Sequence, residues 1–398
     1  MRQGAVTRLL LLCLVAFSAS IVQALVVPAV ALYAAALGAS AGVIGTMIAL
    51  GFAIPLTLAV GVGRMVDAIG ARHLVLSAFV LLTIAPFVAL LAPSLTTLTV
   101  LVALVNVAHV GAIVASQREV ARVGVLRSRG FGWYTTFVAV GQLLGPLAMG
   151  WSLEVWGFAG ALGFASALAT IGLVSGAAFA HTSPASASTS GHTARGVAAP
   201  AESSEISHRA PVMLSMVASA GVLFTMGVHQ TFFPLLLDDL GARPVMIGVI
   251  LSARALAAIV VRPFLATVTR VVGSSGTVLA ACLALAAFGI GAPALAATEL
   301  LALICSFAVG VGSGLAQPLS MVLVSDHTPS HRHGVMLGVR MAVNYAALAS
   351  AALLVGPLVS LAGFGAAFGG AALVPGGLAI STWRARRALD VPADDAAH

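Results

Sequence analysis

The sequence predicts an all-α polytopic membrane protein, and three observations carry this prediction. The 398 residues have a mean hydropathy of +1.09, with 60% hydrophobic and only 8% charged residues, whereas about a quarter of the residues of soluble domains are charged. Apolar windows of the roughly 20 residues that a spanning helix needs follow one another almost end to end. These windows do not alternate apolar and polar residues as barrel strands do, so helices are the expected spanning elements.

Turn signals and charges divide the apolar sequence into twelve predicted spans, six on each side of a polar segment. The predicted spans are residues 10–34, 41–62, 73–93, 96–116, 131–152, 157–181, 211–237, 244–264, 276–296, 299–323, 334–358 and 362–383. The N-terminus imitates a secretory signal peptide, with basic residues before an apolar run. The apolar run continues to Leu37, however, which favours a retained first helix over a cleaved signal.

The polar segment 182–210 is rich in Ser, Ala and Pro and is predicted to be a flexible linker. It separates an N-terminal six-helix bundle, 1–181, from a C-terminal bundle, 211–384. A polar tail, 385–398, is predicted to be disordered. Both ends are predicted to be cytoplasmic.

The arginines support this topology. All 19 basic residues are Arg, and with a cytoplasmic N-terminus only Arg243 falls on the opposite side, while Arg254 and Arg340 fall within spans. Because cytoplasmic loops carry an excess of basic residues, the bias supports both the number of spans and the orientation. The formal charge of +7 therefore reflects topology and not a nucleic-acid-binding face.

The two halves repeat one another. The segment LGASAGVIG at 37–45 matches LGARPVMIG at 240–248, 203 positions later. Near an offset of 200, Gln117 aligns with Gln317, so these two residues are interpreted as repeat-related. A duplicated six-helix unit with parallel halves is a transporter architecture, with a substrate site expected near the membrane midplane.

The segment GVGRMVDAIGAR at 61–72 concentrates charges between two apolar spans. It resembles the cytoplasmic loop between the second and third helices of the major facilitator superfamily, although Ala68 and His73 stand where that pattern has basic residues. The resemblance implies the twelve-helix fold of the family and a gating latch on the cytoplasmic side, near Gly334. Arg64 and Arg72 also fit a topological role alone. The matching positions are Gly63, Asp67, Gly70 and Arg72.

The fifth predicted span contains GQLLGPLAMG. Its small residues and proline resemble a signature of the drug–proton antiporters of the same superfamily, which implies export. The alternative interpretation is ordinary close packing of helices through small residues. The matching positions are Gly141, Gly145, Pro146 and Gly150.

Ionisable and amide side chains inside spans are the candidates for binding substrate or protons, because such groups are costly in a membrane. No carboxylate lies in the middle of a predicted span, and Asn106 stands where the family often has a buried Arg before Gly111. The histidines are therefore the natural titrating groups, although a packing role is equally open for each. The candidates are Gln23, His109, Gln117, His229, Gln230, Arg254, Gln317, Arg340 and Asn344.

The two intramembrane arginines receive different interpretations. Arg254 lies near the middle of its span with no acid at similar depth, so an anionic substrate group, backbone carbonyls or water would have to compensate its charge. Arg340, six residues into its span, can extend toward the cytoplasmic interface and is interpreted as structural.

The sequence predicts no enzyme, cofactor or metal site. It predicts a monomeric secondary transporter in the inner membrane of a bacterium, whose partners are the lipid bilayer and a small-molecule substrate, but not nucleic acid. Protons are the coupling ions in the leading interpretation. Proton-coupled efflux of a small organic compound is the leading interpretation. Uptake or exchange of a small organic anion is one alternative, and a receptor or scaffold that does not transport is another.

Overall fold

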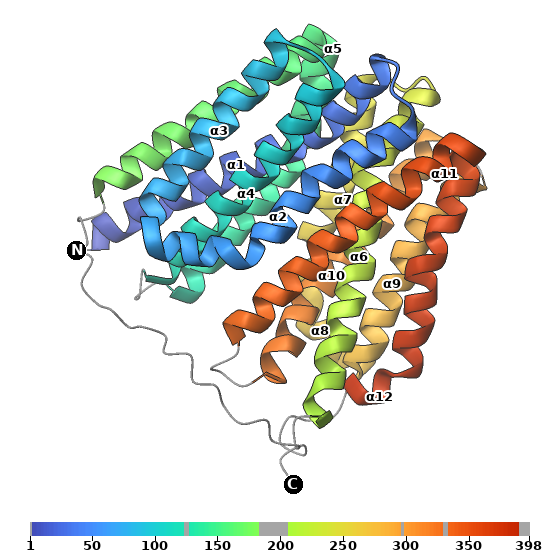
Figure 1. Ribbon diagram of the computed structural model, residues 1–398. Coiled ribbons are helices and arrows are strands. Elements are labelled where there is room, and N and C mark those ends of the chain that lie inside the picture. The colour runs from blue at the N-terminus through green and yellow to red at the C-terminus, as the bar shows by residue number, and fades with distance from the viewer. Residues whose placement is uncertain (1, 123–126, 183–205, 296–297, 329–332, 390–398) are drawn as a thin grey trace.

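A computed structural model describes residues 2–122, 127–182, 206–295, 298–328 and 333–389, and every element in these ranges is a helix (Figure 1). Within the described ranges, nine helices are long and apolar enough to cross a membrane, and a shorter apolar helix covers Ala41–Thr57. Most of the predicted linker and tail, at 183–205 and 390–398, lies outside these ranges.

In the described ranges, the N-terminal half forms five helices, the last of which is interrupted by a kink. They are α1 (Arg2–Ala36), α2 (Ala41–Ile69), α3 (Ala71–Leu91), α4 (Leu95–Arg122) and α5 (Arg127–Thr182). The C-terminal half adds seven further α-helices and two short 3₁₀ turns. They are α6 (Ile206–Asp239), α7 (Pro244–Val261), η3 (Arg262–Phe264), α8 (Leu265–Val272), α9 (Ser275–Gly291), η4 (Ala292–Ala294), α10 (Glu299–Asp326), α11 (His333–Arg384) and α12 (Arg386–Leu389).

Two pairs of predicted spans are joined into single long helices. The predicted spans 131–152 and 157–181 both lie in α5, which bends at Gly157 with φ 68°. The predicted spans 334–358 and 362–383 lie in α11, which bends at Gly363 with φ 77°. Glycine adopts this left-handed conformation at little cost, so the chain turns at one residue without needing a loop.

The duplication predicted from sequence is present in the backbone. Among the described residues all positive-φ positions are glycines, and they fall into three pairs 203, 203 and 206 residues apart: Gly38 with Gly241, Gly70 with Gly273, and Gly157 with Gly363. Helices α4 and α10 each have 28 residues and begin 204 positions apart, at Leu95 and Glu299. The chain therefore turns at equivalent places in both halves.

This spacing corrects the alignment of Gln117 with Gln317. With an offset of 204 between α4 and α10, Gln317 is equivalent to Ile113, and Gln117 is equivalent to Met321. The sequence match near an offset of 200 was one helical turn out of register, because apolar helices offer several similar alignments one turn apart.

Three boundaries also differ from the predictions. Helix α2 continues to Ile69 instead of ending near residue 62, so the predicted loop is reduced to a turn at Gly70. The span predicted at 244–264 becomes α7, a 3₁₀ turn at Arg262–Phe264 and α8. The beginning of the predicted disordered tail is helix α12, whose Leu389 is buried.

The two halves lie side by side and meet through a few helices (Figure 1). The contacts between halves are those of α2 with α11, α5 with α7, and α1 with α6. Within the halves, α1 packs along α5, and α11 packs along α6 and α9. The polar side chains described next lie on several of these helices and on α4 and α10, which pack against them.

Candidate functional site

The N-terminal half has a small polar cluster between α1, α2 and α4. The Gln23 amide donates to Asn106 Oδ1 at 3.4 Å, and the Asn106 amide donates to the Gly51 carbonyl at 3.3 Å. Asn106, at the position where the superfamily often has an arginine, is thus satisfied inside its own half. His109, one turn further along α4, has a buried Nε2 with no hydrogen-bond partner among the described residues.

The C-terminal half has a polar cluster built from α6, α7 and α10. His229 on α6 is 1% exposed, and its Nε2 lies 2.8 Å from Ser306 Oγ on α10. Its other ring nitrogen, Nδ1, is buried without a partner among the described residues. Arg254 on α7 is 8% exposed and lies close enough to His229 for its positive charge to act on the imidazole. No described residue forms a hydrogen bond or ion pair with its guanidinium.

Arg340 does not extend to the membrane interface, contrary to the sequence prediction. It is 6% exposed, and its guanidinium donates to the Gln317 carbonyl at 3.0 Å, to Gln317 Oε1 at 2.7 Å and to Ser320 Oγ at 3.2 Å. Ser219 on α6 extends this network by donating to Asn344 Oδ1 at 2.9 Å. Three candidates, Gln317, Arg340 and Asn344, therefore form one network between α6, α10 and α11.

Two candidate amides are not part of these clusters. Gln117 is exposed near the end of α4, and Gln230 is half-buried next to His229. Neither makes a hydrogen bond to the described part of the chain. No group of three or more His, Cys, Asp or Glu side chains in the described ranges is arranged to hold a metal ion.

The glycines of GQLLGPLAMG lie at two helix contacts. A Cβ atom on Gly141 would come within 2.7 Å of the Phe17 carbonyl oxygen, and one on Gly145 within 2.9 Å of the Ile21 carbonyl oxygen, so both glycines seat α5 against α1. Gly150 contacts the other half instead, since a Cβ there would lie 2.3 Å from the Pro244 carbonyl oxygen. Small residues are what such close helix approaches require.

The predicted gating segment is only partly described. Gly63 and Asp67 lie within α2 and Gly334 lies at the start of α11, but the side chain of Asp67 lies outside the described part of the structure. Gly70 forms the turn before α3 with φ 82°, and Arg72 is exposed at the start of α3.

Sequence analysis missed the junction between the halves, which we call the glycine junction. In α2 and α11, a Cβ on Gly45 would meet the Ala352 carbonyl oxygen at 2.2 Å, and one on Gly356 would meet the Ala41 carbonyl oxygen at 2.6 Å. In α7 and α5, a Cβ on Gly248 would meet the Pro146 carbonyl oxygen at 2.4 Å. Gly45 and Gly248 are the last residues of the two repeated segments. The repeat in the sequence therefore marked both glycines, but it did not indicate which helix each one contacts.

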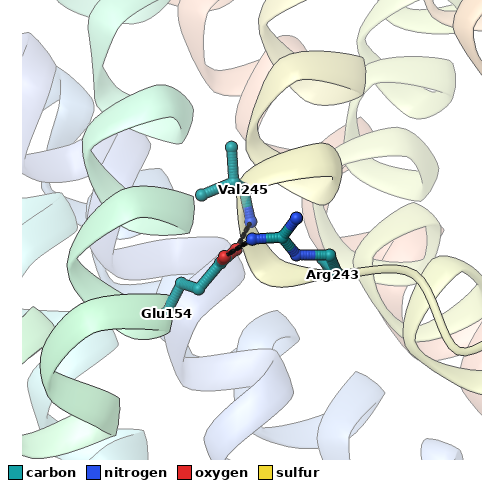
Figure 2. A network of polar contacts seen from close by, with 3 residues as sticks. All are labelled: Glu154, Arg243 and Val245. Atoms are coloured by element: carbon teal, nitrogen blue, oxygen red, sulfur yellow. Dashed lines mark hydrogen bonds and ion pairs between the residues drawn. The ribbon is translucent and has the colours of Figure 1, made fainter.

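The same junction contains two helix caps that cross between the halves. The backbone amide of Gly42, at the start of α2, donates to Ser360 Oγ at 2.8 Å. The amide of Val245, 203 positions later at the start of α7, donates to Glu154 Oε2 at 3.1 Å. These amides have no acceptor within their own helix, and a side-chain oxygen supplies one. Arg243 also forms an ion pair with Glu154 (Figure 2).

Comparisons with known proteins agree with this architecture. The sequence profile of the Major Facilitator Superfamily matches residues 12–352 and 216–394. Among solved structures, a mutant form of the peptide transporter POT has a TM-score of 0.82 at 16% identity, covering 96% of this chain and 94% of that one.

Two other solved structures are similar. A POT family transporter in complex with 5-aminolevulinic acid has a TM-score of 0.76 at 13% identity, with 96% of each chain covered. A mutant form of the nucleoside transporter NupG has a TM-score of 0.74 at 14% identity, covering 96% of this chain and 99% of that one. Among curated protein sequences, none matches the chain. At these identities the likeness to solved structures is one of fold.

Proposed function

Because the chain belongs to the Major Facilitator Superfamily, and is therefore a multi-pass membrane protein of a transporter family, we propose that it is a secondary active transporter working by alternating access. The observation that carries this proposal is the glycine junction. It brings the two halves into backbone contact through two equivalent helix pairs, α2 with α11 and α5 with α7. The two halves are similar and contact each other through small, equivalent surfaces. This arrangement is typical of transporters whose halves rock about a central site.

The proposed topology has twelve spans in two bundles, with residues 1–181 and 211–384 as the moving units and both termini in the cytoplasm of a bacterium. The bends at Gly157 and Gly363 each divide a long helix into two crossings. The apolar part of α2 supplies a further crossing. With a cytoplasmic N-terminus, the turns at Gly38 and Gly241 face the exterior. The glycine junction would then close the exterior side.

On the cytoplasmic side, we propose that Gly63, Asp67, Gly70 and Arg72 act as the latch of the opposite state. Asp67 is the main candidate, because acidic residues contribute little to topology. A carboxylate at the start of α11 would be favoured by the helix dipole.

Export of a small organic compound in exchange for protons is the first candidate activity. It rests on the antiporter-like motif of α5 and on the two histidines within the helices, His109 and His229, as groups able to change charge. Uptake or exchange of a small organic anion is the second candidate, and Arg254, which has no acidic partner among the described residues, favours it. The structural relatives include a peptide transporter and a nucleoside transporter, whose substrates are also small organic molecules.

Reconstituted vesicles test these activities. Substrate counterflow by the purified protein supports a transporter, and its absence for every compound tested supports the receptor or scaffold alternative. An imposed pH gradient then separates the directions. Expulsion of substrate against the inward flow of protons supports export, whereas accumulation in the direction of proton flow contradicts it. A molecular mass corresponding to one chain in detergent would support the proposed monomer.

A further inference from the structure

We propose that Arg254 and His229 form a binding site for the carboxylate of the transported compound, so that the cargo is a small organic anion. The inference rests on the transport function proposed above and names its substrate class. Three observations carry it. The two side chains lack hydrogen-bond partners, their helices contact α10 at neighbouring points, and the equivalent positions of the other half have apolar residues or glycine.

The first observation is that both groups are buried and unsatisfied. Arg254 is 8% exposed and His229 is 1% exposed. His229 Nδ1 is buried without a hydrogen-bond partner among the described residues, and none of these residues forms a hydrogen bond or ion pair with the Arg254 guanidinium. An unpaired charge is costly in a membrane interior, and an unpaired polar group is costly in any buried site. Both groups would be satisfied by an oxyanion placed between them.

The second observation places the two groups at the same level of the bundle. The His229 ring contacts Ser306 on α10. Gly310, one turn further along α10, accommodates the backbone of Arg254, because a Cβ at Gly310 would lie 2.2 Å from the Arg254 carbonyl oxygen. Four residues of helix span about 6 Å. Contact points so close together on one helix hold α6 and α7 in a fixed arrangement.

The hydrogen bonds also determine which atoms face a ligand. If the Ser306 hydroxyl donates to His229 Nε2, the neutral imidazole carries its proton on Nδ1 and donates with it. The site then offers a guanidinium and one N–H, and an ionised carboxylate is a pure acceptor with two oxygens. His229 also packs on Phe233 with ring centroids 4.6 Å apart, and an apolar wall of this kind strengthens charged hydrogen bonds.

The third observation is that the fold does not need these polar groups. With the offsets of 203 and 204, the positions equivalent to Arg254, His229 and Ser306 are Gly51, Val26 and Val102. Both valines are fully buried, and Gly51 packs on Val102. The same helix crossing is therefore stable with apolar residues, and replacing buried charges by apolar groups is often neutral or stabilising. Binding of a ligand would explain why Arg254, His229 and Ser306 are polar in this half.

Ligand-dependent thermal unfolding of the purified full-length protein tests the proposal. The probes are small aliphatic and aromatic compounds, each supplied as the carboxylate, the primary amide and the amine. We expect only carboxylates to raise the unfolding temperature of the wild type. Arg254→Met should abolish the response, and Arg254→Lys should keep part of it. Arg270→Met, which removes an exposed arginine on α8, should leave it unchanged.

Substitutions of His229 test the second side chain of the proposed site independently of Arg254. His229→Leu should weaken carboxylate binding by about 10- to 100-fold, the usual effect of losing a hydrogen bond to a charged group. His229→Gln, which retains a donor, should recover part of the affinity. Equal stabilisation of wild type and Arg254→Met by carboxylates, or no carboxylate that stabilises the wild type, overturns the proposal.

Vesicle counterflow separates this inference from the proposed function. Carboxylate binding that depends on Arg254 without any flux in vesicles would leave the site in place and refute the transporter. Flux of amides or amines that is unchanged in Arg254→Met would retain the transporter and refute the carboxylate site.

Discussion

At the scale of single residues, the duplication provides an internal comparison for each buried polar group. Tyr134 in α5 bonds Ser116 Oγ at 2.9 Å and the Ile113 carbonyl at 3.2 Å. Arg340, 206 residues later in α11, bonds Ser320 and the Gln317 carbonyl, which are the equivalents in α10. The two halves thus fix the same helix crossing with a phenol in one and a guanidinium in the other, and we interpret Arg340 as structural.

This interpretation predicts a loss of stability in Arg340→Ala. The substitution removes the three buried hydrogen bonds that the guanidinium donates to Gln317 and Ser320, and a hydrogen bond to a charged group contributes about 1.5–3 kcal/mol. The unfolding temperature should fall markedly, while the stabilisation by substrate should persist in the folded fraction. Tyr134→Phe, which removes the equivalent bonds, is the matched variant and should also lower the unfolding temperature. A lost substrate response with unchanged stability in Arg340→Ala would contradict this role.

The ion pair between Arg243 and Glu154 allows a second prediction, because its two members differ in exposure. The Arg243 side chain is 81% exposed and that of Glu154 is 23% exposed, so the attraction is screened by water. Glu154 also caps the start of α7 through Val245 (Figure 2). Glu154→Ala should therefore lower the unfolding temperature more than Arg243→Ala does. Equal effects of the two substitutions would mean that the ion pair, and not the cap, stabilises the junction.

Sequence analysis located Arg254 and His229 as candidates because ionisable residues are conspicuous in apolar spans. It could not identify their neighbours, since Ser306 is 77 residues from His229 and nothing in its local sequence distinguishes it from a packing serine. It also misplaced Arg340. Distance from a helix end suggested an interfacial side chain, whereas Gln317 and Ser320, on a different helix, hold the guanidinium inside the bundle.

At the scale of helices, hydrophobic length predicted where the apolar segments lie but not how they end. Loops were expected at 153–156 and 359–361, between predicted spans, yet the single left-handed residues Gly157 and Gly363 suffice to turn α5 and α11. Helix α2 exceeds its predicted end because charged residues at a membrane surface do not stop a helix; Gly70 does. The thickness of the bilayer determines how long an apolar segment is, whereas the local backbone geometry determines the residue at which its helix ends.

The glycine junction gives the prediction at this scale. In Gly248→Ala, the added Cβ would lie 2.4 Å from the Pro146 carbonyl oxygen, so α7 and α5 cannot close fully. Overpacking of about 1–3 kcal/mol would reduce the population of the closed state by about 5- to 150-fold. Vesicle flux should fall, while both bundles remain folded.

Gly370→Ala in α11 is the matched control, because a Cβ there meets no atom within 4 Å. It adds the same methyl group and should leave flux unchanged. Helical alanine is about 1 kcal/mol more favourable than glycine, so this control should not lose stability. If flux falls equally in both variants, the closeness of the junction is not what limits the cycle.

At the scale of the whole molecule, two similar bundles meet at surfaces that are similar but not identical. Ser360 caps α2, whereas Glu154 caps α7 with Arg243 beside it. The repeat could be recognised in the sequence from the segments at 37–45 and 240–248. The pairing of each bundle with the other could not, because the cross-bundle contacts join residues more than 300 positions apart in α2 and α11.

A disulfide across this surface tests whether its opening is part of the cycle. A Cβ at Gly42 would lie 3.4 Å from Ser360 Oγ, so cysteines at the two positions would have their side chains in contact, as a disulfide requires. We expect oxidised Gly42→Cys/Ser360→Cys protein to lose substrate flux and to regain it on reduction, because the bond holds α2 against α11. The single variants should respond to neither treatment, and the native Cys13, Cys282 and Cys305 are buried. Cross-linked protein that transports at the wild-type rate would show that this surface stays closed throughout transport, and the two bundles would then have to move in another way.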